Sequence, residues 1–263
     1  MIVLPRYEPI HTLAKDSGFP LLNAFLALVY CHAVLWSLGI QHCDISEHNL
    51  MADPLTGYPK LCDSDLSHIE GDILPECLFS NTGTWTFMAI ELLTPEAMNG
   101  HVKRLYRHDV ESFLAVLAWI LLRYNENGQL LPDPPVSEWS DTSYLVCAER
   151  RRAIYQGFST IRKPGWLSSD IWVALLLAIN DLLKLINLVS SFKADISTKK
   201  SVPRAFSDTV HISQDEVRRM EQLNDLRFVK EVLNWVFFAL QTDSPKWAPL
   251  MNKIYVLELE RHT

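Results

Sequence analysis

Glycine is scarce in this chain of 263 residues. Its nine glycines are spread so widely that the closest two, Gly157 and Gly165, lie eight positions apart. No G-x-G-x-x-G, G-x-x-x-x-G-K-[ST] or G-x-S-x-G pattern can therefore be written within the chain. This excludes a glycine-rich phosphate loop in these residues, and it also excludes the nucleophile elbow of the α/β-hydrolases.

Basic residues and paired cysteines are also few. The 24 lysines and arginines stand against 31 acidic residues, which gives a net charge of −7. An acidic chain lacks the basic face that nucleic-acid binding needs, so we predict no nucleic-acid partner. The five cysteines are scattered without a C-x-x-C pair, which favours reduced thiols. Because no signal peptide is recognised either, we expect a cytoplasmic or nuclear protein.

No segment of the chain is predicted to span a membrane. Residues 110–122 are very apolar but shorter than the ~20 residues that a spanning helix needs. Residues 171–189 are long enough, but Asn180, Asp181 and Lys184 interrupt them. We therefore predict two buried helices of a soluble protein and no membrane partner.

The apolar periodicity predicts a mainly α fold. A helix at 21–38 should end at Gly39, and further helices are expected at 108–124, 170–190 and 215–241. Two short apolar runs flank the turn-forming residues Asp53, Pro54, Gly57 and Pro59, which predicts a small β-hairpin. Residues 68–83 are mixed in character and are predicted to be a surface loop.

Residues 42–49, with the sequence HCDISEHN, fit the pattern H-x-D-x-x-x-x-N of phosphoryl-transfer catalytic loops. In that pattern Asp44 would accept the proton of a substrate hydroxyl, and the amide oxygen of Asn49 would face a metal ion. Asp63 follows 19 residues after Asp44, at the end of an apolar strand, where a kinase places its chief Mg²⁺ ligand. Each residue alone is typical of turns, but the ordered combination predicts a Mg²⁺-dependent site.

Residues 82–93, TGTWTFMAIELL, resemble the end of a protein-kinase activation segment, with AIE in the place of A-P-E. Thr84 is then expected in the loop that meets the substrate. Glu91 is expected to form a structural ion pair, and its arginine partner stays open between residues 150–152 and 218–219. Asp109, at the start of the buried helix, is expected to brace the catalytic loop or to cap the helix.

Together, HCDIS, DSDLS, GTWTFMAIELL and HDVESFLAVLAW resemble the fungal-type protein kinases, a divergent family of eukaryotic protein kinases. The resemblance extends over residues 6–124. It implies a protein-kinase-like C-terminal (large) lobe at 1–190, with the hinge and the last small-lobe strand at 1–12 and the activation segment at 63–91. The N-terminal lobe is expected to be missing from the chain. Residues 191–214 are interpreted as a polar linker or insert, and residues 215–263 as a helical continuation.

The resemblance also implies the chemistry. The family transfers a phosphoryl group from ATP, with Mg²⁺, to a serine or threonine of a protein substrate. Asp44, Asn49 and Ser46 are the implied catalytic residues, Asn49 and Asp63 the implied ligands of Mg²⁺ and nucleotide, and His42 a structural residue. Ser46 stands where many kinases carry a lysine that contacts the γ-phosphate.

Two other functions stay open at this point. The chain has no glycine-rich loop, and Lys15 is the only lysine before Asp44, which is compatible with a pseudokinase-like binding module without catalysis. A small-molecule phosphotransferase would share H-x-D-x-x-x-x-N, but it would lack the T-G-T-W…E-L-L segment that holds a peptide. The sequence does not identify a protein substrate or partner.

Overall fold

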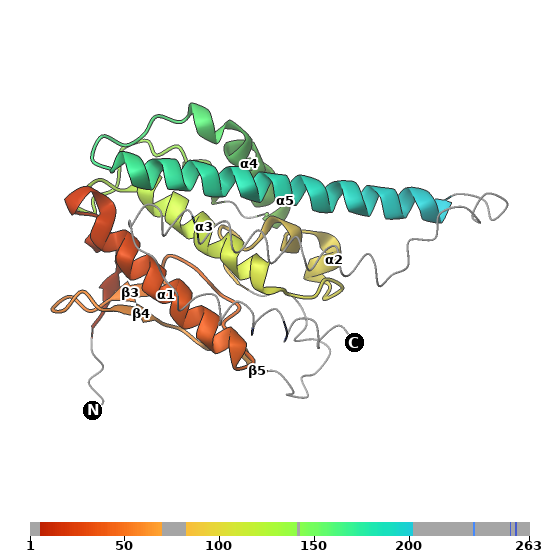
Figure 1. The fold of residues 1–263 in the computed structure, drawn as a ribbon, viewed down its shortest axis with the longest axis horizontal. Helices are drawn as coiled ribbons and strands as arrows, with labels where there is room; N and C mark the ends of the chain where they lie inside the picture. Colours follow the sequence, from red (N-terminus) through yellow and green to blue (C-terminus); the bar gives the residue numbers. More distant parts are fainter. Residues whose placement is uncertain are drawn as a thin grey trace.

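The computed structural model describes residues 6–69, 83–140 and 143–201, together with Asn234, Lys253 and Val256. Figure 1 shows helix α3 between α1 and α5, with small strands beside α1. In chain order the main elements are β1 (Glu8–Pro9), α1 (Phe19–Ser37), β2 (Ile40–Gln41), β3 (Leu50–Ala52), β4 (Pro59–Leu61), β5 (His68–Ile69), α2 (Pro95–Met98), α3 (Tyr106–Arg123), α4 (Tyr144–Gly157) and α5 (Ser169–Ser201). The predicted mainly α fold with a small hairpin is confirmed.

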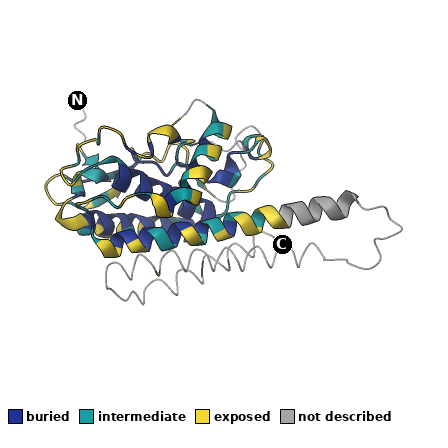
Figure 2. Ribbon diagram, turned by 90° about the horizontal axis from the view of Figure 1, so that it is seen from above, coloured by how far each residue is buried: buried dark blue, intermediate teal, exposed yellow. Residues whose placement is uncertain are grey.

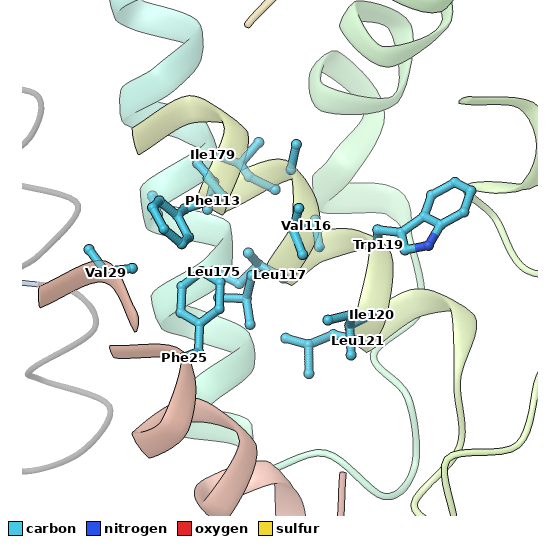
Figure 3. Close-up of a cluster of buried hydrophobic side chains, with 14 of the residues drawn as sticks. Phe25, Val29, Phe113, Val116, Leu117, Trp119, Ile120, Leu121, Leu175 and Ile179 are labelled. Atoms are coloured by element: carbon cyan, nitrogen blue, oxygen red, sulfur yellow. The ribbon is translucent and has the colours of Figure 1, made fainter. Parts of the chain in front are cut away.

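Helix α3 is the centre of the core. Every residue from Tyr106 to Leu122 is buried, as its nearly all-round apolar sequence predicts. Figure 3 shows Phe25 of α1 and Leu175 of α5 packed near Phe113 of α3. The rings of Phe25 and Phe113 meet edge to face, with centroids 5.7 Å apart. Burying each such side chain stabilises the fold by about 1.5–3 kcal/mol.

Helix α1 begins and ends at glycines. Gly18 precedes it at φ +91°, and Gly39 follows it at φ +83°. Residues with a Cβ rarely adopt these left-handed conformations, so a glycine just past the last turn terminates the helix cleanly. The predicted helix at 21–38 is thereby confirmed to within two residues at each end.

The strands form two small antiparallel sheets. One has the order β1-β3-β4, with Glu8 opposite Ala52 and Leu50 opposite Leu61. The predicted hairpin is confirmed: the Oδ1 atom of Asp53 accepts the backbone N–H groups of Leu55 and Thr56 and closes its turn.

The second sheet pairs β2 with β5, and His68 lies opposite Gln41. The surface loop predicted at 68–83 is therefore wrong at its first two residues. Pairing with β2, which lies well before them in the chain, is not visible in their local sequence. Residues 70–82 lie outside the described residues.

The later helices differ from the sequence prediction in two ways. Helix α4 was not predicted, and α5 continues to Ser201, so the predicted helix end at residue 190 was wrong. No proline or glycine occurs between residues 190 and 201, so nothing there stops a helix. The stretch interpreted as a polar linker or insert thus begins as helix, and its residues 202–214 lie outside the described residues. The helix predicted at 215–241 also lies outside them, except Asn234, which is helical.

Two helical stretches, Asp16–Ser37 and Ser169–Ser191, are long and apolar enough to cross a membrane by length and composition. The first stretch was not among the apolar segments named from the sequence. Half of the first stretch and 44% of the second are buried inside the molecule, and core helices of soluble proteins meet the same test. Figure 2 shows α5 with buried residues where it meets the other described helices. The absence of a membrane partner stays a prediction.

Candidate functional site

The carboxylate of Asp44 lies against Thr84, forty residues further along the chain. Its Oδ1 atom accepts the backbone N–H of Thr84 at 2.8 Å and the Thr84 hydroxyl at 3.0 Å. Gly83 permits this approach: it has φ +137°, and a Cβ there would lie 3.0 Å from the carbonyl oxygen of Cys43. The structure thus brings together the residue predicted as catalytic base and the residue predicted for the substrate loop.

Asn49 closes the loop that carries Asp44. Its Nδ2 atom donates to the backbone oxygen of Asp44 at 2.9 Å and to Asp44 Oδ2 at 3.0 Å. The backbone N–H of Asn49 donates to the carbonyl of Ser46 at 3.1 Å. Both side-chain bonds use the amide nitrogen, so Oδ1 is the Asn49 atom suited to a metal ion. Ser46 is only 2% exposed, and its catalytic role stays a prediction.

Asp63 leaves the hairpin at the same end as Asn49. The N–H of Cys62 donates to the carbonyl of Asn49 at 2.9 Å, which continues the β3–β4 ladder by one step, and Asp63 comes next. Asp63 is exposed and has φ +60°. A left-handed conformation costs a non-glycine residue roughly 1–2 kcal/mol, and such residues gather at functional sites.

The donor chemistry at this end of the hairpin suits Mg²⁺. Asp63 supplies carboxylate oxygens and Asn49 an amide oxygen, which are the hard ligands that Mg²⁺ prefers. In the part of the chain that the structure describes, no group of three or more His, Cys, Asp or Glu side chains could hold a metal ion.

His42 connects the catalytic loop to the strand that leads to Asp63. It is 2% exposed, and its Nε2–H donates to the carbonyl of Cys62 at 2.9 Å. Burial lowers the pKa of His42, which keeps the ring neutral. Its neighbour Cys43 has φ +66°, and burial raises the pKa of the Cys43 thiol to about 11. That thiol is therefore unreactive, and the arrangement agrees with the structural role predicted for His42.

Asp109 ties two helices together. Its Oδ1 accepts the Nε–H of Arg104 at 2.8 Å, and its Oδ2 lies 3.0 Å from Nε2 of His32 on α1. Burial alone would raise the pKa of Asp109, but Arg104 and His32 together hold it well below its usual range. The helix N-cap is Leu105, so Asp109 is not the cap. Direct bracing of the catalytic loop by Asp109 stays a prediction.

The ion pair of Glu91 is formed with a residue that was not among the expected partners. Glu91 Oε2 lies 2.5 Å from Nη2 of Arg107 and 3.0 Å from Nε2 of His108. The structure thus pairs Glu91 with an arginine that belongs to neither of the two groups left open, and residues 218–219 lie outside the described residues. Sixteen residues separate Glu91 from Arg107, and no spacing rule links a loop acid to the start of a following helix.

A second ion pair fastens the same segment, and the sequence did not predict it. Arg151 of α4 donates to the carbonyls of Thr86, at 2.9 Å, and Met88, and it lies 3.3 Å from Glu111 Oε1. The same Glu111 oxygen accepts the N–H of Ile90 at 2.8 Å. Glu111 lies on a helix that is buried all round, so its need for a buried partner was the available signal.

His108 should make stability depend on pH. Its Nδ1 accepts the N–H of Leu105 at 3.0 Å, so Nε2 carries the proton that is donated to Glu91. Burial and the charge of Arg107 lower the pKa of His108 to about 4. As pH falls below ~6.5 the unfolded chain takes up a proton that the folded chain refuses, so stability is lost. Between pH 7.5 and 5.5 we expect a loss of about 1.4 kcal/mol, measured by urea denaturation.

The matched control for this prediction is His101, which is exposed. His108→Gln should reduce the difference in the free energy of unfolding between pH 7.5 and pH 5.5. His101→Gln should leave that difference as it is in the wild type. An equal pH dependence in wild type and His108→Gln would contradict the neutral, buried state of His108.

The first part of the chain matches a known protein family. Residues 1–121 match the fungal protein kinase family. This confirms the resemblance inferred from the motifs, over a segment that contains Asp44, Asn49, Asp63 and Thr84. No curated protein matches the chain. The matched segment thus holds Asp44, Asn49, Asp63 and Thr84, while Arg151, which binds the carbonyls of Thr86 and Met88, comes from α4 beyond the match.

Proposed function

We propose that the chain carries the phosphoryl-transfer site of a protein kinase that acts on serine or threonine hydroxyls with Mg-ATP. The observation that carries the proposal is the contact between the Asp44 carboxylate and Thr84. This contact joins the H-x-D-x-x-x-x-N loop to the segment that in kinases holds a peptide. The match of residues 1–121 to the fungal protein kinases supports it.

In this proposal the proton of the substrate hydroxyl passes to a carboxylate oxygen of Asp44. Asn49 orients that carboxylate through its Nδ2 atom, while Asn49 Oδ1 and Asp63 would hold Mg²⁺. When bound, Mg²⁺ would neutralise charge on the phosphate groups of ATP. Thr84 keeps Asp44 turned toward the substrate segment, and a peptide hydroxyl would replace the Thr84 hydroxyl at Oδ1.

The second candidate is a binding module without catalysis. Two observations favour it: the chain contains no glycine-rich phosphate loop, and both oxygens of the Asp44 carboxylate accept hydrogen bonds from the protein itself. Such a module would keep the fold and the Asp44–Thr84 contact but would not bind nucleotide.

Thermal denaturation with and without millimolar Mg-ATP distinguishes the two candidates. A ligand at about 100 times its Kd should stabilise the native chain by about 2.7 kcal/mol, which is visible as a rise in Tm. We expect Asp63→Asn to abolish the rise, because Asp63 would hold the metal ion. Asp53→Asn, which changes an exposed turn aspartate, should retain it.

No rise in Tm for a wild-type chain that melts cooperatively would favour the binding module. Phosphorylation of a small alcohol but of no protein would favour a small-molecule phosphotransferase. A rise that survives in Asp63→Asn would contradict the role given to Asp63.

A further inference from the structure

Glu47 lies in the catalytic loop between Asp44 and Asn49, and its carboxylate is bound by three other parts of the chain. Oε1 lies 3.0 Å from Nδ1 of His11, in the short helix Ile10–Leu13. Oε2 accepts the indole N–H of Trp119, on α3, at 2.6 Å. The hydroxyl of Tyr124, just past α3, also lies near this carboxylate and helps to lower the pKa of Glu47.

This carboxylate is buried, which makes its partners necessary. Glu47 is 5% exposed and Trp119 is also 5% exposed. A buried carboxylate without donors would be strongly destabilising, so the loop can occupy this position only when the donors are in place. Figure 3 shows the Trp119 indole pointing away from Phe25 and Phe113. Its N–H reaches Glu47 on the side of the core where Phe87 and Trp139 pack against the Trp119 ring.

The partners themselves are fixed in place. The ring of His11 stacks on that of Tyr124, with centroids 3.9 Å apart and planes 9° from parallel. The guanidinium of Arg123 lies over the Trp119 ring at 4.3 Å, and Phe87 meets the same ring edge to face at 5.6 Å. The Glu47 carboxylate therefore binds to a rigid set of rings.

We propose that Glu47 is a positioning residue, which holds the loop bearing Asp44 and Asn49 in place through Trp119, Tyr124 and His11. The bonds from Asn49 to Asp44 and to Ser46 lie within the loop, so they do not attach the loop to the core. Glu47 supplies the connection to the core. That the positioned loop is catalytic rests on the proposed function, whereas the positioning itself does not.

Trp119→Phe and Trp139→Phe form the matched pair for the test. Trp119 and Trp139 are neighbouring buried tryptophans, with ring centroids 6.1 Å apart, but the Trp139 N–H has no hydrogen-bond partner among the described residues. Both changes remove an indole from the same core, and only the first removes a donor to Glu47. Amide hydrogen exchange of the full chain, without nucleotide, gives the readout at the backbone N–H of Asn49 and Thr84.

In Trp119→Phe we expect these two amides to exchange at least ~10-fold faster, while amides of α1 keep their wild-type rates. In Trp139→Phe the exchange rates of all these amides should stay within about twofold of the wild-type rates. Equal acceleration in both variants, or none in Trp119→Phe, would overturn the proposal. Because no nucleotide is present, this result is independent of whether Mg-ATP binds.

A second pair of variants keeps the test decisive if Trp119→Phe does not fold. Glu47→Gln keeps a side chain of the same shape that still accepts the indole N–H, and its amide can donate to a His11 ring in the other tautomer. We therefore expect Glu47→Gln to keep the protection of Asn49 and Thr84, and Glu47→Leu to lose it. Loss of protection in both variants, or in neither, would show that Glu47 does not act through these hydrogen bonds.

Discussion

Replacing Arg151 with methionine is expected to lower the free energy of unfolding by about 3–5 kcal/mol. The guanidinium is 1% exposed, and it holds the carbonyls of Thr86 and Met88 as well as Glu111. Methionine fills much of the volume but leaves a buried carboxylate and two carbonyls without their donor. Urea denaturation, or a fall in Tm on the order of 10 °C, would measure the loss.

The next residue along α4 provides the control. Arg152 is exposed, so Arg152→Met should change stability by no more than about 0.5 kcal/mol. Burial raises the pKa of Glu111 even beside Arg151, so its negative charge is costly to the fold and more so without the guanidinium. Adding Glu111→Gln should therefore restore part of the stability lost in Arg151→Met. A double variant no more stable than Arg151→Met would show that the lost carbonyl bonds dominate.

Asp44→Asn is expected to reduce phosphorylation of a protein substrate by about 10²–10⁴-fold, the usual contribution of a general base. Asparagine can still accept the Thr84 N–H, although its NH2 group then loses the hydrogen bond from Asn49 Nδ2. It cannot take up the proton of the substrate hydroxyl. The measurement is the transfer of phosphate to a serine- or threonine-containing protein at saturating Mg-ATP.

Asp53→Asn makes the same chemical change in the exposed hairpin turn and should leave the rate as it is in the wild type. Asp44→Asn should still melt cooperatively, with a Tm lowered by a few degrees at most for the one lost hydrogen bond, which separates lost chemistry from lost folding. Full activity in a folded Asp44→Asn chain would contradict its role as the base.

The sequence predicted the residues of the candidate site better than their surroundings. Asp44, Asn49, Asp63 and Thr84 belong to motifs whose order along the chain carries information, and the structure brings Asp44 into contact with Asn49 and Thr84. The hairpin that carries Asn49 and Asp63 was visible in its turn residues. These features depend on local chemistry, which a sequence displays directly.

Partners from distant segments could not be predicted in the same way. Glu47 stands in the polar string SEHN and resembles a solvated acid until Trp119 and His11 are placed beside it. Glu91 had several arginines available, and only the packing of its loop on the start of α3 selects Arg107. Tertiary proximity decides both cases, and no rule of spacing along the chain expresses it.

Helix α4 was missed for a related reason. Its buried residues are Cys147, Arg151 and Tyr155, at the four-residue spacing of a helix face. Because one of these three residues is an arginine, the buried face of α4 has no apolar pattern in the sequence. The segment CAERRRAIYQG therefore resembles a polar loop. The structure shows that this charge is on the inner face, where it binds Glu111 and the carbonyls of Thr86 and Met88.

The burial of α3 on every side has an evolutionary consequence. An ordinary surface helix offers a solvent face on which substitutions accumulate with little effect, so its tolerance to change rises and falls with the helical period. Seventeen successive residues of α3, from Tyr106 to Leu122, are all buried and offer no such face. A change of side-chain volume on this helix is therefore expected to be tolerated best together with a matching change in a residue packed against it.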